Sequence, residues 1–172
     1  GDGAHVPYGN HREGDIVAMA RYMFSFLESR GIKALLVACN TISCVVDRCR
    51  DAVSCFTINA VQAGADAVLV SHNIVTCMDP ALPASLSPAV HQILRDTLGF
   101  DGVILTDDLA MEAVAAYSAD GAVAVMALEA GNDLVITTDY RTQIPKVLEA
   151  VENGTLSMDT IDTACRRVLT WK

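Results

Sequence analysis

The chain has 172 residues, a formal net charge of -9, 52% hydrophobic residues and only 5% aromatic ones. This length allows one good core, or two small ones at most. The acidic balance argues against a nucleic-acid partner, because binding to phosphates needs clustered Lys and Arg. No run approaches the roughly 18 apolar residues of a membrane span, and no signal segment opens the chain. We therefore expect no membrane partner.

The six cysteines are expected to be buried, reduced thiols rather than disulfides or metal ligands. They lack CxxC spacing, and four of them lie in one short stretch. A reducing cytoplasm fits this pattern best. No group of residues has metal-ligand spacing, so no metal site is expected. The cysteines are Cys39, Cys44, Cys49, Cys55, Cys77 and Cys165.

The first elements predicted are a helix and a buried strand. Apolar residues at helical spacing indicate a helix from about Glu13, and Gly31 stands where a C-terminal cap belongs. An apolar run predicts a strand over 34–38. The segments expected next are a helix with Val45, Val46 and Cys49, an indistinct stretch over 54–57, and a short helix ending at Gly64.

The rest of the chain continues the alternation of apolar strands and amphipathic helices. Strands are predicted over 67–71, 103–106 and 134–136. Ser87 and Pro88 suit the N-cap and first residue of a helix that Gly99 closes. Three further helices are expected: an Ala-rich one ending at Gly131, one with Ile144, Val147, Leu148 and Val151 inward, and one that starts at a Ser157 cap and presents Ile161, Cys165, Val168 and Leu169.

The order of these elements predicts an α/β fold. Strands rich in Val, Leu and Ile, without alternation and separated by helices, are typical of βα units and a parallel sheet. A complete barrel takes roughly 200 residues or more. We therefore expect a partial TIM barrel or an open, flavodoxin-like sheet.

Polar residues follow three of the predicted strands, where parallel α/β proteins carry their active residues. These sites are Cys39-Asn40-Thr41, Ser71-His72-Asn73 and Thr106-Asp107-Asp108. An acidic pair at the end of a strand as apolar as GVIL is hard to explain by packing alone. Two interpretations stay open for it: an N-cap of the following helix, or a catalytic carboxylate.

Four motifs resemble bacterial β-N-acetylhexosaminidases of glycoside hydrolase family 3. They are AGADAVLVSH, PASLSPAVHQILRDTLGFDGVILTDDLAMEAV, ALEAGNDLVI and IDTACRRVLTWK. The resemblance runs from about residue 58 to 172, with every element in order. It implies the C-terminal part of that family's barrel, and GFDGVILTDDLAM is the most specific stretch.

The resemblance implies that Asp107 is the catalytic nucleophile of a retaining glycosidase. Asp108 is then a cap or a supporting group. Met111 is either a wall of the sugar pocket or a core residue, and His72 either faces the substrate or bonds locally to support the sheet. The family's acid/base residues follow a KHFPGHG-like run, and this sequence contains neither that run nor counterparts of the Asp and Arg that hold the sugar.

The segment HVPYGNHREGDIVAMARYMFSFLESRGIKALLVACNTIS resembles the N-terminal half of glutamate racemase, over about residues 1–55. The markers are Pro7-Tyr8-Gly9 and, after a strand, Cys39-Asn40-Thr41. The resemblance implies that Cys39 matches one of the two proton-exchanging cysteines, and Asn40 and Thr41 match residues that bind the amino acid. The GCTH-like motif of the second cysteine is missing, which favours a relic or structural role for Cys39.

The chain is therefore interpreted as composite, with a racemase-like segment over 1–56 and part of a family 3 barrel over 57–172, folded as one unit. The favoured function is retaining hydrolysis of terminal N-acetylglucosamine from cell-wall glycans, as in peptidoglycan recycling. A racemase-like protein and an inactive α/β scaffold remain alternatives. We expect a small carbohydrate substrate and no cofactor, since neither resembled family needs one. A homo-oligomer is compatible with a barrel that closes through a partner chain.

Overall fold

The computed structural model describes residues 11–37, 39, 42, 45–54, 56–59, 61, 63–76, 78–118 and 120–171. The chain divides into two compact units. The first unit comprises Gly1–Ala65 with Ile74–Pro80, and the second comprises Asp66–Asn73 with Ala81–Lys172. All the strand pairs described are parallel, so the predicted α/β class with a parallel sheet is confirmed.

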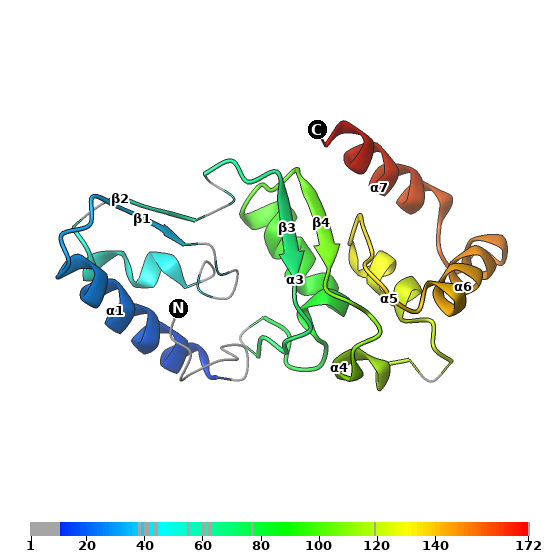
Figure 1. Cartoon of the computed structure of the whole chain (residues 1–172), viewed down its shortest axis with the longest axis horizontal. Helices are drawn as coiled ribbons and strands as arrows, with labels where there is room; N and C mark the ends of the chain where they lie inside the picture. The colour runs from blue at the N-terminus through cyan, green and yellow to red at the C-terminus, as the bar shows by residue number, and fades with distance from the viewer. Residues whose placement is uncertain are drawn as a thin grey trace. The chain divides into compact units, whose positions relative to one another are not determined.

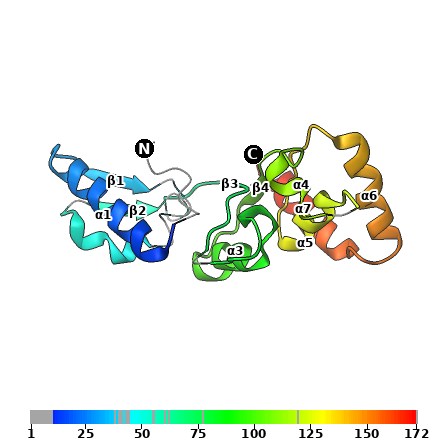
Figure 2. The same cartoon turned by 90° about the horizontal axis from the view of Figure 1, so that it is seen from below.

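The first unit packs one helix on a pair of parallel strands. Helix α1 spans Glu13–Glu28 and buries three residues spaced four apart, Ile16, Ala20 and Phe24. These side chains pack against Leu35 and Val37 of β1, which spans Ala34–Val37. Strand β1 pairs with β2, Phe56–Asn59, with Ala34 opposite Phe56 (Figure 2). The helix expected from Glu13 and the strand expected after it are both confirmed.

Two details of the first unit differ from what the sequence showed. The helix expected to carry Val46 and Cys49 is present as two 3-10 helices, η2 at Val46–Arg48 and η3 at Arg50–Ala52. The fully buried Val46 and Cys49 are three residues apart, a spacing that a 3-10 turn satisfies as well as an α-helix does. The stretch 54–57, which showed no pattern, contains the start of β2.

The second unit is built on three parallel segments of chain. Strand β3 spans Ala67–Val70 and pairs with β4, Val103–Thr106, with Ala67 opposite Val103 (Figure 1). Leu105 of β4 also bridges in parallel to Leu134. The strand expected over 134–136 is thus reduced to one bridge, with the Thr106 N–H donating to the Leu134 carbonyl at 3.2 Å.

Helices cover this small sheet. A short 3-10 helix, η4 at Ala84–Leu86, leads into α3 at Pro88–Gln92. As predicted, Ser87 is the N-cap, and its Oγ accepts from the Val90 N–H at 3.3 Å. A π-helical turn, η5 at Ile93–Thr97, completes α3. The remaining helices are α4 at Glu112–Ala115, α5 at Val123–Ala130, α6 at Tyr140–Glu152 and α7 at Met158–Thr170.

The Ala-rich helix expected to end at Gly131 is confirmed as α5, whose C-cap is Gly131, but a second short helix, α4, precedes it. Gly121 has a positive φ of 78° between them, a conformation that a helix interior does not allow. Ser118 Oγ then accepts from the Ala122 N–H at 2.7 Å, next to the first residue of α5. The local turn chemistry therefore divides the segment.

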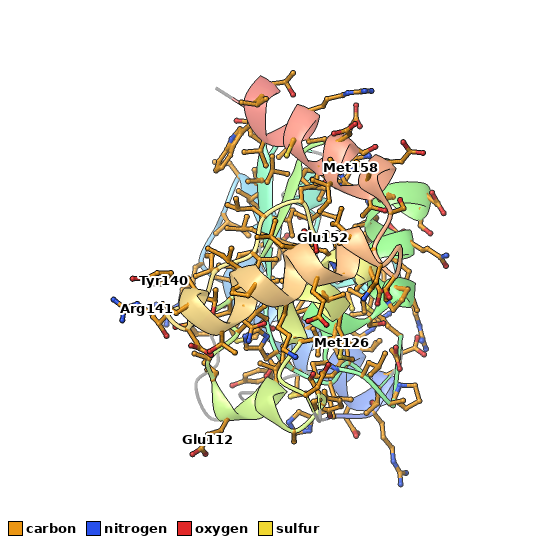
Figure 3. All side chains as sticks on the ribbon, turned by 90° about the vertical axis from the view of Figure 1, so that its right-hand side faces the viewer. Glu112, Met126, Tyr140, Arg141, Glu152 and Met158 are labelled. Atoms are coloured by element: carbon orange, nitrogen blue, oxygen red, sulfur yellow. The ribbon has the colours of Figure 1, made fainter. Side chains whose placement is uncertain are left out.

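The apolar faces of α6 and α7 are only partly buried, in contrast to the sequence expectation. Val147 and Val151 pack against a cluster that contains Val125 and Leu128. Ile144 is 55% exposed and Leu169 is 77% exposed. Figure 3 shows α6 running from Tyr140 to Glu152, with Arg141 beside Tyr140 at its start. Periodicity identified the apolar face, but it could not identify the neighbour that would cover it.

The described cysteines correct one further expectation. Cys39 and Cys165 are exposed, whereas Cys49 is buried, and that burial raises the pKa of the Cys49 thiol. Within the part of the chain that the structure describes, no helix has the length and apolar character needed to cross a bilayer.

Candidate functional site

The carboxyl ends of β3, β4 and the segment at Leu134 lie at one edge of the sheet in the second unit, because all three run parallel. Ser71 and His72 follow β3, Asp107 and Asp108 follow β4, and Thr137 and Thr138 follow the Leu134 segment. This edge is where parallel α/β proteins gather their functional side chains. It is therefore the candidate site.

Asp107 is half-buried and follows the last residue of β4 directly. Its N–H donates to the Val70 carbonyl at 3.3 Å, which continues the pairing of β3 with β4. Its carboxylate Oδ1 accepts from the Asp108 N–H at 2.9 Å. The aspartate is thus held by backbone groups at the end of a rigid strand, an arrangement that suits a positioned carboxylate.

Two backbone N–H groups from different segments hold the Asp108 carboxylate. Its Oδ1 accepts from the backbone N–H groups of Ala110 at 2.9 Å and Thr138 at 3.0 Å. Both hydrogen bonds lower the pKa of the Asp108 carboxyl, and the bond from Ala110 has the larger effect. The bond to Thr138 joins the end of β4 to the segment after Leu134, 30 residues away in the sequence.

Neither aspartate caps the next helix. Helix α4 begins at Glu112, and its N-cap position is Met111. The Asp108 side chain instead closes a turn onto Ala110, as an Asx turn does. The simplest structural explanation of the acidic pair, a helix cap, therefore does not apply to α4.

His72 is 8% exposed, and both of its ring nitrogens have protein partners. Nε2 lies 2.9 Å from the Asp108 carbonyl oxygen, and Nδ1 lies 2.7 Å from Ser85 Oγ. Since a carbonyl oxygen can only accept, Nε2 carries the proton. In the neutral ring Nδ1 then accepts from the Ser85 hydroxyl. His72 is bonded within the protein at both ends of its ring.

Two other predicted site residues, Met111 and Cys39, are exposed and belong to different units. Met111 is 46% exposed, close in sequence to the acidic pair. Cys39 is exposed, just beyond β1 in the first unit. The remaining racemase markers lie outside the described residues: Pro7, Tyr8, Gly9, Asn40 and Thr41.

Sequence reasoning missed the groups that support the site. Ser85 is fully buried, and its carbonyl accepts from Asn132 Nδ2 at 2.8 Å. Thr138 bonds the Asp108 carboxylate through its backbone N–H and through its side chain, 30 residues away in the sequence. Ser85 lies within PASLSP, but its pairing with His72 becomes visible only when β3 and η4 are placed in space.

A buried ion-pair network holds the opposite end of β4. Asp133 Oδ2 accepts from Arg95 Nη2 at 2.5 Å and from the Ile104 N–H at 2.9 Å, and its Oδ1 accepts from Arg167 Nη1 at 3.0 Å. Burial lowers the pKa of Arg95, against the attraction of Asp133. The network connects η5, β4 and α7, and so fixes the strand that carries Asp107.

Metal ligation finds no support among the residues described. No cluster of three or more His, Cys, Asp or Glu side chains is arranged to hold an ion in that part of the chain.

Parallel strands with polar side chains at their carboxyl edge are typical of α/β folds, the TIM barrel among them. The sequence profile of one family, described as "Glycosyl hydrolase family 3 N terminal domain", matches residues 46–171. The chain belongs to this family. The match includes β3, β4 and the whole candidate site.

Two curated relatives and one solved structure show the extent of the similarity. A "Beta-hexosaminidase" of Methylococcus capsulatus is 34% identical over 98 residues, 56% of this chain and 29% of that protein. An "Uncharacterized secreted glycosyl hydrolase" of Arthroderma benhamiae is 29% identical over 115 residues, 63% of this chain and 33% of that protein. The chain thus spans a third or less of these relatives.

The structure of a glycoside hydrolase family 3 β-N-acetylglucosaminidase from Paenibacillus superposes with a TM-score of 0.62 at 24% identity. The superposition covers 91% of this chain and 43% of that one. At this identity it shows the fold alone. Because so much of the chain is covered, the likeness in fold extends into the segment before residue 46. The racemase-like origin of that segment, and the boundary at residue 57, stay predictions.

Proposed function

We propose that this chain carries the nucleophile of a retaining β-N-acetylhexosaminidase, and that Asp107 is that nucleophile. The observation that carries the proposal is the place of Asp107 directly after β4, half-buried at the edge where three parallel segments end. The family match spans this strand. The relative of Methylococcus capsulatus bears the name "Beta-hexosaminidase".

The proposed reaction begins with attack of the Asp107 carboxylate on the anomeric carbon of the sugar. A covalent glycosyl-enzyme forms as the bond to the leaving oxygen breaks, and water later releases the sugar. The Asp108 N–H donates to Asp107 Oδ1 at 2.9 Å and so holds the carboxylate in place for the attack. A second group must protonate the leaving oxygen when the leaving group is an ordinary sugar alcohol.

The described residues at this edge do not supply that second group. His72 uses both ring nitrogens within the protein, and Asp108 Oδ1 is bonded to two N–H groups that favour its ionised form. We therefore propose that the chain by itself cleaves glycosides whose leaving group is a stable anion. On unactivated glycans it is expected to be close to inactive.

The finer parts of the proposal concern substrate and place. The substrate is terminal N-acetylglucosamine on cell-wall-type glycans, which would place the protein in peptidoglycan recycling. A cytoplasmic location is supported by the free thiols of Cys49 and Cys165. A homo-oligomer is supported by exposed apolar residues on α6 and α7, such as Ile144 and Leu169.

The test is release of nitrophenol from a nitrophenyl N-acetylglucosaminide. Asp107→Ala removes the nucleophile and is expected to lower kcat/KM by on the order of 10³-fold or more. Asp96→Ala is the matched control, because Asp96 is an exposed acid of the same unit, on η5 and away from the strand ends. Full activity in Asp107→Ala would refute the assignment.

A further inference from the structure

A chain of hydrogen bonds runs from the core of the second unit to the Asp107 carboxylate. Asn132 Nδ2 donates to the Ser85 carbonyl at 2.8 Å, and Ser85 Oγ lies 2.7 Å from His72 Nδ1. His72 Nε2 then donates to the Asp108 carbonyl at 2.9 Å. The last link is the Asp108 N–H, which donates to Asp107 Oδ1 at 2.9 Å.

The orientation of Asp107 depends on Asp108, because the segment after β4 is irregular until α4 begins at Glu112. The Asp108 carbonyl accepts from His72 and also from the Met111 N–H at 3.1 Å. Its carboxylate holds Ala110 and Thr138. Of these anchors, the His72 ring is the one side chain that bonds the Asp108 carbonyl among the described contacts.

The His72 ring is itself immobilised. Its exposed fraction is 8%, and its hydroxyl partner Ser85 is fully buried at 0%. The Ser85 N–H donates to the Ser71 carbonyl at 3.2 Å, so Ser85 is fixed to the end of β3 by backbone as well as side chain. A ring held in this way transmits the position of β3 to the loop after β4.

We propose that His72 is a positioning residue for the Asp107 carboxylate. It holds Asp108 so that the Asp108 N–H stays bonded to Asp107 Oδ1, which fixes the orientation of the nucleophile. This inference deepens the proposed glycosidase function and rests on it. His72 does not touch the sugar or transfer a proton.

Two substitutions separate this role from simple packing. In His72→Gln the amide nitrogen reaches the place of Nε2 and can still donate to the Asp108 carbonyl. In His72→Asn the amide occupies the place of Nδ1, next to Ser85, and the donor to Asp108 is lost. The two side chains are alike in polarity, so they differ mainly in the bond that the proposal requires.

The first measurement is the exchange rate of the Asp108 backbone N–H by NMR in the full chain. Loss of the His72 donor is expected to raise this rate roughly tenfold in His72→Asn. The rate should stay near the wild-type value in His72→Gln. The Ile104 N–H, held by Asp133 at 2.9 Å in the same unit, should be unchanged in both variants.

The second measurement is hydrolysis of the nitrophenyl glycoside. His72→Asn should lower kcat about tenfold or more with KM unchanged, because a misaligned nucleophile slows the attack without weakening sugar binding. His72→Gln should restore most of kcat. If His72→Asn failed to fold, Ser85→Ala, which removes only the hydroxyl that holds the ring, would be compared in the same two measurements.

The outcomes separate this inference from the proposed function. An unchanged Asp108 exchange rate in His72→Asn would overturn the inference, whatever the activity. Faster exchange with an unchanged kcat would overturn it as well. Absence of glycoside hydrolysis by the wild-type chain would instead overturn the proposed function, and the exchange rates would still decide whether His72 fixes Asp108 against Asp107.

Discussion

Removal of the Asp133 carboxylate is expected to destabilise the second unit strongly. The side chain is 2% exposed and neutralises Arg95, whose side chain is 18% exposed, and Arg167, at 30%. Asp133→Ala would leave Arg95 without its carboxylate partner and Arg167 with only the longer pair to Asp101, at 4.0 Å, and would also deprive the fully buried Ile104 N–H of its acceptor. Breaking a buried ion pair costs about 3–5 kcal/mol. Arg95 keeps the Phe100 and Gly102 carbonyls as partners, which limits the loss to that range.

Urea unfolding followed by the fluorescence of Trp171 measures this loss. Trp171 is the single tryptophan and comes directly after α7, the helix that carries Arg167. We expect Asp133→Ala to lower the free energy of unfolding by about 3–5 kcal/mol. Asp162→Ala, at an exposed position on α7, should stay within about 0.5 kcal/mol of wild type. A loss below about 1 kcal/mol in Asp133→Ala would show that the network does not hold β4.

Two further substitutions test other parts of the account. At Gly102 a Cβ would lie 2.3 Å from the Asp66 carbonyl oxygen, so Gly102→Ala should lower the unfolding free energy by about 1–3 kcal/mol. Gly14→Ala is the control, because the new methyl group meets open space, and it should not destabilise α1. Equal denaturation midpoints for Gly102→Ala and Gly14→Ala would contradict the steric argument. The pKa of Asp108 is lowered in the folded state, so its contribution is present above the ordinary Asp pKa of about 3.9 and is lost as pH falls through the lower folded value. Near neutral pH, wild type should therefore have a larger free energy of unfolding than Asp108→Asn. This difference should shrink below about pH 4, and a difference that grew there would contradict the lowered pKa.

The strands and caps with strong local signals could be predicted from sequence. The apolar run ending at Thr106 gave β4 with its observed bounds, because a buried parallel strand needs no alternation. Ser87 was identified as an N-cap because its hydroxyl and the following Pro88 act within one turn. In both cases the determining interactions lie within a few residues.

The features that sequence reasoning missed depend on partners that are distant in the chain. His72 pairs with Ser85, 13 residues away, and Asp108 with Thr138, 30 residues away. Those pairs exist only because β3, β4 and the Leu134 segment align in parallel. The same limit explains the exposed Ile144 on α6, since its helical spacing showed an apolar face but not what lies opposite.

The position of Asp107 was recognised from the GFDGVILTDDLAM motif, and the structure supplies its surroundings. The bond from the Asp108 N–H, and the absence of a capping role for either aspartate toward α4, strengthen the physical argument for a catalytic carboxylate.

The most direct test is covalent trapping of Asp107. The chain would be incubated with an activated fluorinated N-acetylglucosaminide whose glycosyl-enzyme hydrolyses slowly, and the protein would then be digested and mapped by mass spectrometry. The account predicts one added sugar on the peptide that contains Asp107, and no addition in Asp107→Ala. A sugar attached to a different residue, or labelling that persists in Asp107→Ala, would contradict it.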